Sequence, residues 1–215
     1  MNVLLVDDHP MTAEGYKTSI EKAFNTGKIY FEIANDCKQA YQKVYTQPAT
    51  KFDIVIVDHG LPPYPEEDIF TGCDLAISIK KHLPKCKTII ITAHTEVIIV
   101  YDIYKRLSPD ALIIKTDVTP TNLPVILKEV AAGGHYLSVT AKNCIKEIWK
   151  KELMIEDYNR QILFYLSKGY KVKELGDVIH LAQSTIQRRV VNMKRAFDVT
   201  DDNNLVREAI RQGFI

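Results

Sequence analysis

The stretch FDIVIVD at residues 52–58 is the strongest structural signal in the chain. The residues between Asp53 and Asp58 are all Ile or Val, without the polar alternation of a half-exposed strand. This pattern indicates a β-strand that is buried on both faces of a parallel sheet. Such a sheet needs helices on both sides, and Asp58 would emerge at its carboxyl edge, where open α/β sheets bind ligands.

Similar apolar runs alternate with segments of helical spacing along the front part of the chain. We expect strands at 2–6, 29–34, 54–58, 88–92 and 111–115, and helices at 10–24, 36–45, 74–82, 96–106 and 123–132. Five strands that alternate with five helices predict an α/β fold with a doubly wound, five-stranded parallel sheet of about 130 residues.

Composition and charge indicate an ordinary globular protein. The chain has 215 residues, of which 46% are hydrophobic and 26% are charged, which allows one or two domains. From Lys150 onward it has 12 Lys and Arg against 9 Asp and Glu residues, so the back part is slightly basic. We expect this part to meet a polyanion.

The start of the chain, MNVLLVDD, has acidic residues too early for a signal peptide, and no apolar run approaches the roughly 18 residues of a membrane span. We therefore expect a cytoplasmic protein without membrane contact. Cys37, Cys73, Cys86 and Cys144 are scattered, and we expect them to be reduced thiols.

Right-handed crossovers would bring the ends of four expected strands to one edge of the sheet. This places together Asp7, Asp8, Asp58, Thr92 and Lys115. Three carboxylates in one place repel each other unless a cation compensates, and Mg²⁺ is the natural candidate because it takes hard oxygen ligands and phosphate oxygens.

These residue types suit phosphoryl transfer, which needs mainly positioning and charge stabilisation. We expect Asp58 to accept a phosphoryl group. Asp8 and Asp58 would bind Mg²⁺ directly, Asp7 would act largely through water, and the Gly60 carbonyl would complete the ligand set. The remaining two residues, Lys115 and Thr92, would each hold one phosphoryl oxygen.

The same pattern of strand-end residues resembles the receiver domain of two-component response regulators, a flavodoxin-like fold. The resemblance covers about 130 residues. It implies that a partner histidine kinase phosphorylates Asp58 in the presence of Mg²⁺.

Four features depart from the usual receiver pattern or add to it. The loop after Pro63 has an insertion around residues 64–70, if Gly72 is the glycine that receivers place after the phosphorylated Asp. Thr116 follows Lys115 where a proline is common, and Leu112 replaces the usual switch aromatic. His59 and His94 lie next to the expected pocket, either as modulators of phosphate lifetime or as ordinary rim residues.

The back part of the chain shows helical spacing throughout. Ile145, Ile148 and Trp149 suggest a linker helix with one buried stripe. Further helices are expected at 157–168, 172–179 and 183–197. In the last of these, the apolar stripe consists of Ile186, Val190, Met193 and Phe197. The opposite face consists of Ser184, Gln187, Arg188, Val191, Asn192 and Arg195, flanked by Arg189 and Lys194.

A basic, acid-free helix face that follows a short helix and a tight turn predicts a helix-turn-helix that binds double-stranded DNA. A solvated surface helix is the alternative, but ordinary surfaces mix charges of both signs. The motifs at 160–163, 168–169, 173–175, 184–187 and 192–194 look like the LuxR-type helix-turn-helix.

Together with the receiver pattern, the whole chain resembles the NarL/FixJ class of response regulators. The resemblance implies base contacts by Gln187, Arg188 and Val191, and phosphate contacts by Lys173, Thr185 and Arg189. Ala182 stands where a capping Ser or Thr is typical, which costs about 1 kcal/mol unless the cap moves to Ser184.

We expect a receiver domain at 1–134, a linker at 135–152 and a LuxR-type helix-turn-helix domain at 153–215. The expected function is a DNA-binding response regulator that regulates transcription and forms a homodimer when active, and not an enzyme. An Asp-nucleophile phosphohydrolase is disfavoured because Gly60 stands where a second Asp is needed, and a dinucleotide site lacks its Gly-rich turn. The alternative is an atypical receiver that acts by phosphorylation-independent dimerisation or protein binding.

Overall fold

A computed structural model of the chain describes residues 1–24, 29–46 and 52–215, apart from the side chains of residues 149–155. The chain divides into two compact units, Met1–Cys144 and Ile145–Ile215. The division falls inside the helix α6 (Val139–Ile155). No helix among the described residues is long and apolar enough to cross a membrane.

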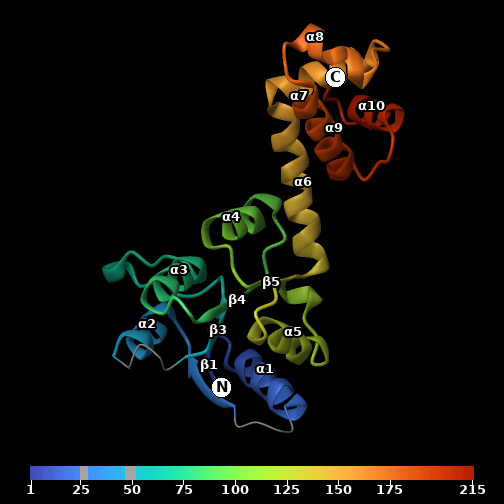
Figure 1. Cartoon of the computed structure of the whole chain (residues 1–215). Helices are drawn as coiled ribbons and strands as arrows, with labels where there is room; N and C mark the ends of the chain where they lie inside the picture. The colour runs from blue at the N-terminus through green and yellow to red at the C-terminus, as the bar shows by residue number, and fades with distance from the viewer. Residues whose placement is uncertain (25–28, 47–51) are drawn as a thin grey trace. The chain divides into compact units, whose positions relative to one another are not determined.

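The first unit contains a parallel sheet in the order β2-β1-β3-β4-β5-β6. Figure 1 labels its strands β1, β3, β4 and β5. Its strands are β1 (Asn2–Val6), β2 (Tyr30–Ala34), β3 (Ile54–Asp58), β4 (Lys87–Thr92), β5 (Ala111–Ile114) and β6 (Tyr136–Leu137). The predicted α/β doubly wound fold is confirmed. The predicted count of five strands was wrong, because Tyr136 and Leu137 pair with β5.

Helices cover both faces of this sheet. They are α1 (Pro10–Ala23), α2 (Cys37–Tyr45), α3 (Gly72–His82), α4 (Val97–Leu107) and α5 (Asn122–Ala131), with two 3-10 turns, η1 (Pro65–Glu67) and η2 (Lys115–Asp117). The helices α1 and α5 pack against each other, and α3 packs on α2 and on α4. Every residue of β3 is buried, as the FDIVIVD stretch predicts.

Alternate residues of the central strands form the core beneath α1 and α5. Leu5, Ile56 and Ile91 lie in this core together with Ile20 from α1 and Leu127 from α5. Because the strands are parallel and in register, Asp58 pairs with Ile91 and thus reaches the same edge as the end of β4.

The second unit is all-helical. Its elements are α7 (Asp157–Ser167), η3 (Val172–Glu174), α8 (Leu175–Ile179), α9 (Gln183–Phe197) and α10 (Asp202–Arg211). The helix expected at 172–179 therefore begins as a 3-10 turn. The core of the unit contains Ile162, Leu175 and Leu205 together with the predicted stripe of α9, including Ile186 and Met193.

The expected linker differs in one respect from what the structure describes. The strand β6 and the first turn of α6 lie beyond residue 134, so the sheet continues past the boundary expected there. Ile145 and Ile148 are half-buried. Trp149, the third member of the expected apolar stripe, has a side chain outside the described part of the chain.

Candidate functional site

The predicted strand-end residues meet at the carboxyl edge of the sheet. Lys115 Nζ lies 2.7 Å from Asp58 Oδ2 and 3.3 Å from Asp7 Oδ2. The side chains of Asp7 and Asp58 are almost fully buried, whereas that of Lys115 is 24% exposed. One ammonium group thus bridges two buried carboxylates, one just after β1 and one at the end of β3.

This arrangement sets the charge of Lys115. Burial alone would favour the neutral amine, but the hydrogen bond and attraction to Asp58, with a further contribution from Asp7, outweigh it and raise the pKa of Lys115. The charged form of Lys115 is therefore favoured beside Asp58 and Asp7.

Asp8 and His9 lie beside this pair, at the start of α1. The His9 amide donates to Asp7 Oδ1 at 2.9 Å, and the His9 ring nitrogen Nδ1 lies 2.8 Å from Asp8 Oδ1. Ligand atoms of Asp7, Asp8 and His9 all fall within 4.8 Å of one another. Carboxylate oxygens at this spacing suit a small divalent cation such as Mg²⁺.

Thr92 and Gly60 border the same pocket. The Thr92 side chain is buried, and its Oγ1 accepts a hydrogen bond from the His94 amide at 3.1 Å. The Thr92 hydroxyl hydrogen can therefore still be donated to another group. The Gly60 amide lies 3.4 Å from Asp58 Oδ1 and faces the carboxylate.

Two histidines flank the site: His59, just after β3, and His94, just after β4. Their rings pack edge to face, with centroids 5.6 Å apart. Burial, with a smaller contribution from His94, lowers the pKa of His59 and so favours its neutral form. His59 Nδ1 is enclosed and has no hydrogen-bond partner. The His59 ring therefore packs against its neighbours without using this nitrogen as a donor or acceptor.

The insertion at 64–70 is fixed to α2. Tyr64 and Ile69 form an antiparallel bridge at its base, and the Ile69 side chain is buried. The Tyr41 hydroxyl donates to Glu67 at 2.9 Å, and this hydrogen bond is the main reason that the pKa of Tyr41 rises to about 12. Tyr41 also packs edge to face on Tyr64. The inserted residues thus have contacts of their own.

In the second unit, α9 presents the predicted polar face. All six side chains of this face are exposed: Ser184, Gln187, Arg188, Val191, Asn192 and Arg195. Lys173 on η3 is also exposed, and Thr185 is half-buried. The helix begins at Ala182 without a side-chain cap, so the cap does not move to Ser184.

Arg189, expected at the edge of that face, lies elsewhere. Its Nη1 contacts Glu156 Oε1 at 2.6 Å and donates to Asn159 Oδ1 at 3.2 Å. Both partners lie at the start of α7, so Arg189 points towards α7 and away from the exposed face of α9.

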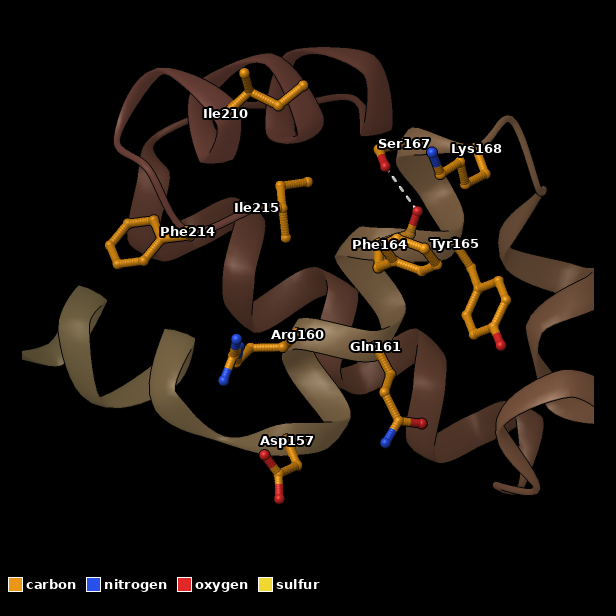
Figure 2. A pocket seen from close by; sticks show the side chains of 10 residues that line it. All are labelled: Asp157, Arg160, Gln161, Phe164, Tyr165, Ser167, Lys168, Ile210, Phe214 and Ile215. Atoms are coloured by element: carbon orange, nitrogen blue, oxygen red, sulfur yellow. Dashed lines mark hydrogen bonds between the residues drawn. The ribbon is translucent and has the colours of Figure 1, made fainter.

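An open hollow of about 730 Å³ lies between α7, α10 and the last residues (Figure 2). Apolar side chains, including Phe164, Ile210 and Phe214, line it together with charged ones, including Asp157 and Arg160. This mixed lining selects no class of ligand.

The sequence model of the response regulator receiver domain matches residues 3–115, more than half of the chain. The chain belongs to this family. The match covers the region that contains Asp7, Asp58 and Lys115.

Individual response regulators match over the whole chain. The response regulator protein VraR of Staphylococcus aureus is 22% identical over 221 residues, which cover all of this chain and 99% of VraR. The transcriptional regulatory protein DegU of Brevibacillus brevis is 20% identical over 239 residues, which cover all of this chain and 95% of DegU.

Solved structures of RcsB share the fold. RcsB of Salmonella typhimurium superposes with a TM-score of 0.59 at 20% identity, over 97% of both chains. RcsB in a complex with DNA gives a TM-score of 0.58 at 20% identity, over 96% of both chains.

The structure also reveals residues of this receiver that sequence reasoning missed. Asp117, two positions after Lys115, accepts hydrogen bonds from the Thr140 amide and hydroxyl at 3.0 Å each. Ser138 Oγ accepts from the Ile114 amide at 3.2 Å. The loop that carries Lys115 is thus joined to the first turn of α6.

The peptide bond between Lys115 and Thr116 is trans, because no cis peptide bond occurs among the described residues.

Proposed function

We propose that this response regulator accepts a phosphoryl group on Asp58 from a histidine kinase and, in response, binds double-stranded DNA to regulate transcription. The observation that carries the first half is the contact of Lys115 with both Asp58 and Asp7. The second half rests on the exposed, acid-free face of α9.

Phosphoryl transfer needs a carboxylate oxygen as nucleophile and positive groups around the transferred oxygens. An Asp58 oxygen forms the new P–O bond while the P–N bond to the kinase histidine breaks, and the histidine keeps that electron pair. Lys115 then shifts its hydrogen bond from Asp58 to a phosphoryl oxygen. The Thr92 hydroxyl donates to a second oxygen, because its own acceptor role towards His94 leaves the hydrogen available.

The carboxylates of Asp7 and Asp8 lie close enough together to fit Mg²⁺. Asp58 is joined to Asp7 through their shared contact with Lys115. Asp8 and Asp58 would hold the ion directly, Asp7 would act through water, and the Gly60 carbonyl would complete the protein ligands. Bound there, Mg²⁺ would neutralise charge on the phosphoryl oxygens.

Phosphorylation is tested with acetyl phosphate and Mg²⁺, followed by intact-mass measurement. The wild-type chain should gain one phosphoryl group, and Asp58→Asn should gain none. Asp53→Asn, at the other end of FDIVIVD, is the matched control and should react like the wild type. An adduct that persists in Asp58→Asn would refute the assignment.

For DNA binding, we propose that α9 enters the major groove, with Gln187, Arg188, Val191 and Asn192 towards the bases. Lys173, Ser184, Thr185 and Arg195 would contact phosphates. We further propose a receiver that starts at residue 1 and extends beyond 134 to include β6, and a DNA-binding domain at 153–215, acting as a homodimer on two half-sites. A solved RcsB structure described as two dimers bound to DNA supports the dimer.

DNA binding is tested by mobility shift on promoter fragments from the organism that encodes the chain. Arg188→Ala should weaken binding by about 1–3 kcal/mol if it reads a base. Arg160→Ala, an exposed arginine on α7, is the control and should bind as the wild type does. Unchanged binding by Arg188→Ala would refute the proposed recognition face.

A second candidate function is favoured by Leu112. This residue is fully buried in β5, where related receivers carry a switch aromatic that changes position. The alternative is an output by dimerisation or protein binding that is independent of phosphorylation. Equal DNA affinity and equal mass in solution for phosphorylated and unphosphorylated protein would favour it.

A further inference from the structure

The adjacent arginines of α9 differ in their surroundings. Arg188 is exposed on the polar face, whereas the side chain of Arg189 is only 21% exposed. Because neighbouring positions on a helix point about 100° apart, one can face solvent while the other faces the domain. The two arginines therefore cannot serve DNA in the same way.

The guanidinium of Arg189 is occupied. Nη1 contacts Glu156 at 2.6 Å and Asn159 at 3.2 Å, and the group lies over the Tyr158 ring, 5.5 Å from its centroid. Nε is enclosed and has no hydrogen-bond partner. A bidentate grip on phosphate needs two parallel N–H groups of the guanidinium, and Nη1 and Nε are both unavailable.

The partners of Arg189 are themselves fixed. Glu156 is the residue before the first turn of α7, and its carbonyl accepts from the amides of Asn159 and Arg160. The fully buried Asn159 side chain donates from Nδ2 to Glu156 Oε2 at 3.2 Å. Only Asn159 of this network is buried, whereas the Glu156 side chain is 46% exposed. Loss of a member would leave the buried Asn159 amide without a partner, so the network favours one arrangement.

We propose that Arg189 is a positioning residue that clamps α9 to the start of α7 through Glu156 and Asn159, while Arg188 contacts DNA. The proposal rests on the proposed DNA-binding function and deepens it. Arg189 does not touch the phosphate backbone. Its role is to fix the angle at which α9 presents its polar face.

The clamp is tested first without DNA, by hydrogen exchange and mass spectrometry of the full chain. Arg189→Gln and Glu156→Gln should each speed exchange of peptides within 183–197 by about fivefold, because each breaks the same network. The double variant should exchange no faster than the faster single variant. Effects that multiply in the double variant would overturn the clamp.

The division between the arginines is tested by the salt dependence of binding to a random-sequence DNA duplex. Each lost phosphate contact lowers the slope of log K against log salt by about 1. Arg195→Gln, at an exposed arginine of α9 proposed above to contact a phosphate, should show this loss. Arg189→Gln should keep the slope and bind roughly two- to tenfold more weakly, through misplacement of α9.

Glu156→Gln gives the sharpest outcome because it leaves Arg189 in place. If Arg189 positions α9, this variant binds DNA more weakly with an unchanged slope. A stronger affinity with a slope increased by about 1 would show that Glu156 masks a phosphate contact, and would overturn the proposal. Wild-type protein that binds no DNA would refute the proposed function, whereas the exchange experiment would still decide on the clamp.

Discussion

Gly72 lies directly against the backbone carbonyl of Asp58. A Cβ atom at Gly72 would approach the Asp58 oxygen to 1.8 Å, far inside van der Waals contact. The Gly72 amide also donates to the His59 carbonyl at 2.9 Å. The start of α3 thus packs on the backbone of the proposed phosphoacceptor.

Gly72→Ala should displace this backbone, since the clashing atoms belong to the main chain and not to a flexible side chain. We expect a loss of stability of about 3 kcal/mol and slower phosphorylation of Asp58. Calorimetry and acetyl phosphate kinetics measure the two effects. Gly15→Ala in α1 is the control, because a Cβ there meets no atom within 4 Å; equal damage by both changes would contradict the explanation.

Lys115→Ala should destabilise the first unit by about 2 kcal/mol at pH 7, because two buried carboxylates lose their shared cation. Mg²⁺ should raise the melting temperature of this variant more than that of the wild type, since a bound cation restores the missing charge. Thermal scans with Mg²⁺ and with a chelator test this. Lys17→Ala, a surface lysine of α1, should respond to Mg²⁺ as the wild type does.

Asp117→Asn should weaken the attachment of α6 to the loop after β5. Burial alone would raise the pKa of Asp117, but hydrogen bonds from Ser138 and Thr140 outweigh it and lower this pKa below the ordinary 3.8. The ionised form is therefore favoured in the folded state. Its contribution to stability is present above pH 3.8 and is lost as the pH falls towards the lowered value.

We expect Asp117→Asn to cost about 1 kcal/mol at pH 7 and to flatten the loss of stability below pH 3.8. Urea unfolding at several pH values, followed by a probe in the first unit, measures both. Glu14→Gln, on the surface of α1, is the control. A pH dependence identical to that of the wild type would exclude Asp117 as a contributor.

Ala182→Ser should stabilise the second unit by about 1 kcal/mol. Ala182 is the N-cap residue of α9 and offers no side-chain acceptor to the first turn. A serine hydroxyl there can accept from an unpaired amide, such as that of Ser184. Denaturant unfolding tests this, and Ser184→Ala should leave stability nearly unchanged because Ser184 is not the cap.

The sequence predicts the sheet and the pocket because both follow from strong local signals. Runs such as FDIVIVD have no stable place except in a buried strand, and parallel strands bring Asp7, Asp58 and Lys115 to one edge whatever the loops do. The strand β6 escaped prediction because Tyr136 and Leu137 are too few to show a period.

Contacts between side chains distant in sequence are what the sequence does not reveal. Asp117 and Thr140 meet only because the sheet and α6 place them together. Arg189 lies at the border between the two faces of its helix. The direction of its side chain therefore depends on whether a partner such as Glu156 lies within reach. The family resemblance predicts that Arg189 contacts DNA, whereas in the folded domain its guanidinium pairs with Glu156 of the same unit.

The bridge between Tyr64 and Ile69 closes the inserted loop at its base. Residues 65–68 therefore project from this bridge. A change in them need not move the segments that join Tyr64 to Asp58 and Ile69 to Gly72. A fluorescent or spin label carried there would sit on a loop that is closed at its base and joined to α2, while the backbone around Asp58 stays intact. The projection is thus a natural position from which to observe the receiver change state in real time.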